Sequence, residues 1–124
     1  MMAWKFNNDA PIYSQIIEEI KLRIAQGKLK PGDKVPPVRE LALKAGVNPN
    51  TMQKALSELE REGVLYSQRT AGRFVAEHIL DSHDMKKTIS IKYTTEYLKG
   101  MRELEYSNEE IIVCLKEFMN EEEK

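Results

Sequence analysis

The stretch that decides the fold is VNPNTMQKALSELE, residues 47–60. Its apolar residues recur at the three- and four-residue spacing of one helical face, namely Met52, Ala55, Leu56 and Leu59. The other face is polar over the first two turns, with Asn50, Thr51, Gln53, Lys54 and Ser57. A helix placed with its first turns in a DNA major groove contacts bases and phosphates through such positions. The stretch is therefore predicted to be a recognition helix.

A short second helix is predicted just before it, after Pro36-Pro37. Residues 38–45 place Val38, Leu41, Ala42 and Ala45 on an inward face. Arg39 lies on the outward face, and Gly46 supplies a sharp turn. A short helix, a glycine turn and a polar-faced helix together indicate a helix-turn-helix.

Upstream, an aliphatic stripe predicts a core helix that opens at Asp9-Ala10-Pro11 and closes at Gly27, with Ile12, Ile16, Ile17, Ile20 and Ile24. Residues 28–34 are expected to form a loop with a Pro-Gly turn. Its three lysines could contact phosphate or simply be solvated.

Downstream, the periodicity changes from helical to alternating. Residues 64–68 and 73–76 are predicted to be two strands around a turn at 69–72. A hairpin directly after a recognition helix is a wing, and Arg69 and Arg73 could reach the minor groove or the backbone. The alternative is a solvated turn with two incidental arginines.

Five segments in order resemble the GntR family of transcriptional regulators: PIYSQI (11–16), LKPGDKVP (29–36), VRELA (38–42), VNPNTMQKA (47–55) and LEREG (59–63). The resemblance implies a winged helix-turn-helix that binds double-stranded DNA. It implies base or phosphate contacts for Arg39, Asn50, Thr51, Gln53 and Lys54, and wing contacts at Arg69 through Gly72. With Arg73, these residues form the predicted DNA-binding set.

Two positions depart from the family pattern. Pro37 stands where the family usually has a serine or another small or polar residue. The second helix must therefore start without a side-chain cap, and one phosphate contact of the family is expected to be missing here. The wing tip reads Thr70-Ala71-Gly72 instead of Gly-x-Gly. Losing the first glycine is expected to restrict this turn.

Charge divides the 124-residue chain near residue 77. Residues 1–77 hold 12 Lys/Arg against 9 Asp/Glu, whereas residues 78–124 hold 7 against 11. We therefore expect a DNA-binding domain at 1–77 and a different role for 78–124. A cytoplasmic protein without a membrane span is expected, because the amino terminus lacks a signal-peptide core and Cys114 has no partner for an internal disulfide.

The acidic tail is predicted to form two amphipathic helices in a hairpin, the second opened by a capping box at Ser107 and Glu110. Two such helices bury their apolar faces most simply against a second copy. The predicted homodimer residues are Met85, Ile89, Tyr93, Tyr97, Met101, Ile112, Leu115 and Met119. The tail most resembles that of the short YtrA-like subfamily. This resemblance implies dimerisation and a link to ABC-transporter genes.

Other functions receive less support. No nucleophile–base pair or phosphate-cradling loop indicates an enzyme. A metal site at His78, Asp81, His83 and Asp84 is not predicted, because these residues occupy a connector, and no cofactor is expected. Tyr93 and Tyr97 fit a core or interface better than a ligand pocket, although an unknown small-molecule effector stays open. A winged helix used only for protein interaction is the remaining alternative to a DNA-binding repressor.

Overall fold

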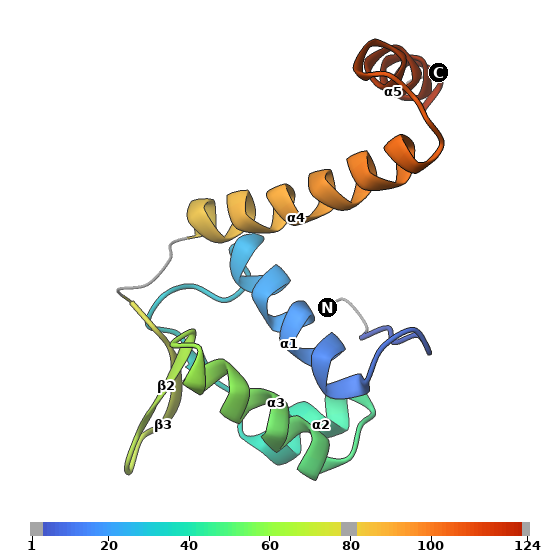
Figure 1. Cartoon of the computed structure of the whole chain (residues 1–124). Coiled ribbons are helices and arrows are strands. Elements are labelled where there is room, and N and C mark those ends of the chain that lie inside the picture. The colour runs from blue at the N-terminus through green and yellow to red at the C-terminus, as the bar shows by residue number, and fades with distance from the viewer. Residues whose placement is uncertain (1–3, 78–81, 123–124) are drawn as a thin grey trace. The chain divides into compact units, whose positions relative to one another are not determined.

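The computed structural model describes residues 4–77 and 82–122, with side chains from residue 85 onward in the second range. The chain forms two compact units, Met1–Lys87 and Thr88–Lys124. The elements are α1 (Ile12–Ala25), β1 (Lys34–Val35), α2 (Val38–Ala45), α3 (Pro49–Arg61), β2 (Leu65–Gln68), β3 (Gly72–Val75), α4 (Ser82–Glu103) and α5 (Asn108–Glu122). The predicted fold, mainly helical with a small β element, is confirmed (Figure 1).

The first unit is built around α3. This helix packs against α1, α2 and β2, and the wing formed by β2 and β3 projects beside it (Figure 1). The largest fully buried side chains come from α1, α3, β2 and β3: Ile16, Ile24, Met52, Leu56, Leu59, Leu65 and Val75. The aliphatic stripe of α1 and the apolar stripe of α3 thus meet in one core, as their spacing predicts.

Local chemistry forms the turn between α2 and α3. Gly46 ends α2 with a φ of 71°, a left-handed conformation that glycine adopts without steric cost. The Asn48 side chain accepts a hydrogen bond from the backbone N–H of Asn50 at 2.7 Å, and Pro49 occupies the first position of α3. The predicted helix-turn-helix is confirmed.

The sheet has one strand more than the sequence predicts. Residues 34–35, predicted to be the end of a loop and the residue after it, form β1, and the strand order is β1-β3-β2 with antiparallel pairing. Lys34 pairs with Phe74 and Val35 with Arg73. The backbone of Asp33 extends this pairing by accepting from Val75 N at 2.9 Å. A two-residue strand has no visible alternation, so only its partner reveals it.

The second unit contains α5 and most of α4. Ser107 and Glu110 form the predicted capping box, with reciprocal side chain–backbone bonds of 3.2 and 3.0 Å. The prediction that the two tail helices pack side by side as a hairpin is wrong, because the described parts of α4 and α5 share no extended interface. Ile111 is the one buried residue in the described part of α5, so its apolar face is largely exposed.

Candidate nucleic-acid interface

The outward face of α3 is polar because its apolar side chains are entirely used in the core. Met52, Ala55, Leu56 and Leu59 are each 0 % exposed. The exposed residues of the first two turns are Asn50, Gln53, Lys54 and Ser57, with Thr51 half-buried beside them. Four of the five predicted recognition positions are therefore open to a ligand, and none of the four is needed for packing.

Two contacts orient side chains on this face. Gln53 Nε2 donates to Ser57 Oγ at 3.1 Å, which holds the amide along the middle of the helix. The Lys54 ammonium lies 4.0 Å from the ring centroid of Tyr13 in α1, a cation–π contact. Lys54 thus places its charge at the α1 edge of the face. This position suits a phosphate better than a base edge.

Arg39 is the second residue of α2, and its side chain is exposed. The helix starts from Pro37, which makes no side-chain cap, as the departure from the family pattern predicts. Backbone N–H groups at an uncapped helix start carry partial positive charge and attract anions. Arg39 and this helix start therefore present positive charge together, which suits contact with a guanine edge or with a phosphate.

The wing tip closes without the first glycine. Ala71 N donates to Gln68 O at 3.1 Å, and the left-handed conformation that the tip needs falls on Gly72, with a φ of 108°. Thr70 thus does not need a left-handed conformation in this turn. A Cβ on Gly72 would lie 3.2 Å from Lys34 Cε, so β1 brings a further lysine beside the tip. Gly72 contributes to the wing through its backbone conformation.

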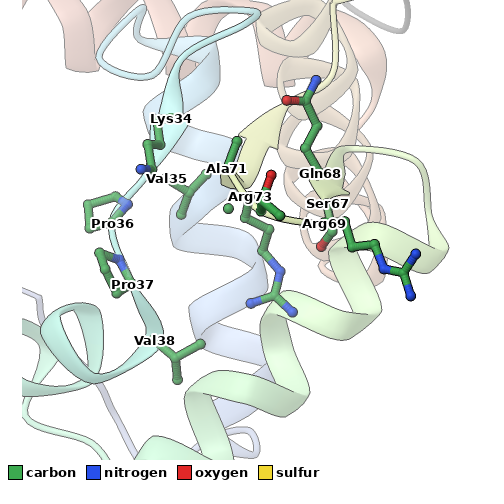
Figure 2. A pocket seen from close by; sticks show the side chains of 12 residues that line it. Lys34, Val35, Pro36, Pro37, Val38, Ser67, Gln68, Arg69, Ala71 and Arg73 are labelled. Carbon is green, nitrogen blue, oxygen red and sulfur yellow. The ribbon is translucent and has the colours of Figure 1, made fainter.

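The two wing arginines take different positions. Arg69 is exposed at the tip, and its side chain extends away from Pro36 and Pro37 (Figure 2). Arg73 is only 16 % exposed, because its Nε donates to the Glu60 carboxylate at the end of α3. The structure thus brings Arg69 to the surface and uses Arg73 to tie the wing to the recognition helix.

Glu60 is a site residue that the sequence analysis missed. Its carboxylate accepts hydrogen bonds from Ser67 in β2 and from Arg73 in β3. Partial burial pushes the pKa of Glu60 up, but the bonds from Ser67 and Arg73 outweigh burial, so the pKa lies below its usual value. The available signal was an acidic residue on α3 followed by a basic wing, but the pairing depends on tertiary contact.

Glu60→Gln is expected to lower the free energy of unfolding by about 1 kcal/mol at neutral pH, because the charge-assisted bond to Arg73 is lost. The folded-state pKa of Glu60 is depressed, so its contribution is present above the unfolded value near 4.5 and disappears as pH falls through the folded pKa. Urea unfolding at neutral and acidic pH measures both effects.

The matched control is Glu58→Gln, since Glu58 pairs with Arg61 inside α3 and not with the wing. Amide hydrogen exchange in β2 and β3 should accelerate in the Glu60 variant and stay unchanged in the control. Equal protection of the wing in both variants would contradict the role of the Glu60–Arg73 bond in holding the wing to α3.

A cleft of about 460 Å³ runs between the wing and the segment from β1 to α2 (Figure 2). Its lining carries three cations and no carboxylate: Lys34, Arg69 and Arg73. An open channel with this charge suits a polyanionic backbone more than a small neutral molecule. The wing, β1 and the start of α2 therefore form one positive surface beside α3.

The predicted dimer residues differ in accessibility. Tyr93, Tyr97, Ile112, Leu115 and Met119 are exposed in the single chain, and Ile89 and Met101 are half-buried. Met85 is 4 % exposed and belongs to the first unit, so a partner cannot reach its side chain in this structure.

The His78, Asp81, His83 and Asp84 side chains lie outside the described residues. Elsewhere in the described chain, no group of three metal-ligating side chains gathers.

Comparison with known proteins agrees with this geometry. Residues 12–75 match the model of bacterial regulatory proteins of the gntR family. The HTH-type transcriptional regulator YhcF of Bacillus subtilis is 38 % identical over 114 residues, which cover 92 % of this chain and 94 % of YhcF. The B. subtilis repressor YtrA is 48 % identical over 71 residues, covering 57 % of this chain and 55 % of YtrA.

Solved structures give the same result. A GntR family regulator from Listeria monocytogenes superposes with a TM-score of 0.83 at 35 % identity, covering 90 % of this chain and 98 % of that one. The DNA-binding domain of AraR, solved in complex with operator ORX1, matches 61 % of this chain and all of its own at 36 % identity and a TM-score of 0.55. The chain belongs to the GntR family and is a transcriptional regulator with a winged-helix DNA-binding domain. Its family regulates transcription, and its relatives include the YtrA-like regulators.

Within the described residues, no helix has both the length and the apolar character needed to cross a membrane.

Proposed function

We propose that this regulator is a homodimeric repressor that binds a palindromic operator through α3, Arg39 and the wing. The observation that supports it most is the division of α3 into a buried apolar stripe and an exposed polar face. Two copies related by a twofold axis would present two such faces about one helical turn of DNA apart. The operator complex of AraR supports the use of this surface for DNA.

Repression is proposed because occupancy of a promoter needs no further contact with the transcription machinery. The relatives named as repressors, such as YtrA, support this direction of control. The regulator would act in the cytoplasm on an operon that includes ABC-transporter genes, with a small-molecule effector as a further partner.

A winged helix used only for protein interaction is the alternative. It gives no reason for the cationic cleft beside α3.

Gel-shift titration on the upstream region of the protein's own operon tests the proposal. At about 150 mM salt, affinity for this DNA should exceed affinity for random duplex by at least about a thousandfold. A random duplex of equal length is the control. Equal affinity for the two duplexes would favour the interaction module and contradict specific repression.

The second unit supplies the dimer surface in this proposal. On α5, apolar side chains occupy one helical face next to buried Ile111, and those of Ile112, Leu115, Phe118 and Met119 are 41–58 % exposed. An apolar face of this extent is costly in water and is normally covered by a partner. Tyr93 and Leu104 are further large apolar side chains of the same unit that are exposed in the single chain.

The double substitution Leu115→Glu and Met119→Glu is expected to convert the dimer to a monomer, because it buries two carboxylates in an apolar contact. Operator affinity should fall on the order of a hundredfold, since the second half-site no longer binds intramolecularly. Sedimentation equilibrium measures the oligomeric state.

Val113→Glu is the matched control, because Val113 is also 53 % exposed but lies on the opposite side of α5 from Ile111. This variant should remain dimeric. A dimer that survives the double substitution would refute α5 as the interface.

A further inference from the structure

A second cavity lies in the first unit, and it shares only Val35 and Pro36 with the lining of the cleft beside the wing. It is about 280 Å³ in volume and more enclosed than the wing cleft. We call it the Trp4 cavity. Its lining comes from the residues before α1, from α1 and the loop after it, from β1 and from α2: Trp4, Ile20, Arg23, Lys28, Leu29, Val35, Pro36, Leu41 and Lys44.

The lining has an apolar body and a cationic rim. Ile20, Val35 and Leu41 are buried, and they form the floor with Leu29 and Pro36. The ionisable groups in the lining are three cations, and no acidic side chain lines the cavity. Ligand sites combine a mostly apolar wall with a few polar groups in this way, and here the polar groups all carry one sign.

Two of these cations already hold carboxylates. Arg23 Nε lies 3.1 Å from Glu19 Oε1, and Lys44 Nζ lies 3.3 Å from Glu40 Oε1. Both glutamates are outside the lining. The rim therefore shows carboxylate binding within the chain itself, and a ligand carboxylate could join or replace these partners.

Local structure holds the rim in place. The backbone N–H groups of Lys28 and Leu29 donate to Arg23 O at 2.9 and 3.2 Å, so the loop folds back over the end of α1. The Arg23 guanidinium carbon lies 4.3 Å from the ring centroid of Trp4, which closes one side of the cavity. These contacts lie within the chain itself and fix the lining, so little ordering would oppose binding.

Size limits the ligand. An apolar cavity of about 150 Å³ accommodates benzene, so about twice that space accommodates one ring with a short acidic side chain. We propose that the Trp4 cavity binds a small molecule with an aromatic or branched apolar body and a single carboxylate. This site adjoins the proposed operator surface at Val35 and Pro36, but its occupancy can be measured without DNA.

Titration of the whole protein with phenylacetate tests the proposal. Trp4 is the chain's one tryptophan, so its fluorescence reports on the cavity directly. Saturable binding is expected with a Kd on the order of 1 mM or tighter, a reasonable limit for about ten non-hydrogen atoms. Neutral phenylacetamide should bind at least about threefold more weakly, because it lacks the charge that the rim recognises.

Two variants with a matched control locate the site. Leu29→Phe should narrow the cavity and weaken the fluorescence response, with circular dichroism confirming that the variant is folded. Lys28→Gln with Lys44→Gln should raise the Kd about threefold to tenfold. Lys30→Gln with Lys86→Gln removes the same charge from outside the lining and should leave the Kd unchanged.

Three results would overturn the proposal. The first is the absence of a saturable response to phenylacetate, and the second is equal affinity for phenylacetate and phenylacetamide. The third is a change in Trp4 emission on dilution without ligand, which would show that a second chain covers the cavity.

Discussion

Leu56→Ala should lower the free energy of unfolding by about 2–5 kcal/mol, the largest change expected for a single substitution in this chain. Leu56 is 0 % exposed in the middle of α3, the helix that packs against α1, α2 and β2. Removing its side chain loses buried apolar area and leaves a cavity that the surrounding helices can fill only in part. Urea unfolding followed by circular dichroism measures the loss.

Leu43→Ala is its control, because Leu43 lies on α2 and is 84 % exposed. The same chemical change there should alter stability by no more than about 0.5 kcal/mol. A Leu56 variant as stable as the Leu43 variant would contradict the placement of the α3 stripe in the core.

Arg39→Ala should weaken operator binding by about 1–3 kcal/mol and weaken binding to random duplex less. The side chain is exposed at the start of α2, beside helix N–H groups that have no side-chain cap. Truncation removes a bidentate donor without disturbing the core, so the loss reports on contact and not on folding. Fluorescence anisotropy on both duplexes measures the two affinities.

Two further variants make this result specific. Arg69→Ala at the wing tip should reduce the salt dependence by about one counterion while affecting both duplexes more equally. Lys116→Ala in α5 removes one exposed positive charge from the second unit and should leave both affinities unchanged. Equal loss on operator and random DNA for Arg39→Ala would refute its role in reading bases.

The helix-turn-helix could be predicted because its signals are local. The Met52–Leu59 stripe, the left-handed Gly46 and the Asn48 cap each act within a few residues. The same is true of the capping box at Ser107 and Glu110. Where neighbours in sequence determine the structure, the pattern predicts both the element and its end.

What the sequence did not show depends on partners distant along the chain. β1 is a strand only because β3 pairs with it, and Arg73 is tied to α3 only because Glu60 is near. The Trp4 cavity likewise brings together residues 4 to 44, whose spacing carries no motif.

The pairing of β1 with β3 has a consequence for the thermodynamics of DNA binding. Val35 lies four residues before Arg39 and pairs with Arg73. The backbone that leads to Arg39 is therefore joined to the wing through the sheet. Little conformational entropy then remains to be lost on association, and the heat-capacity change should reflect buried surface without a contribution from coupled folding. A two-residue strand would thus make recognition close to a rigid-body event.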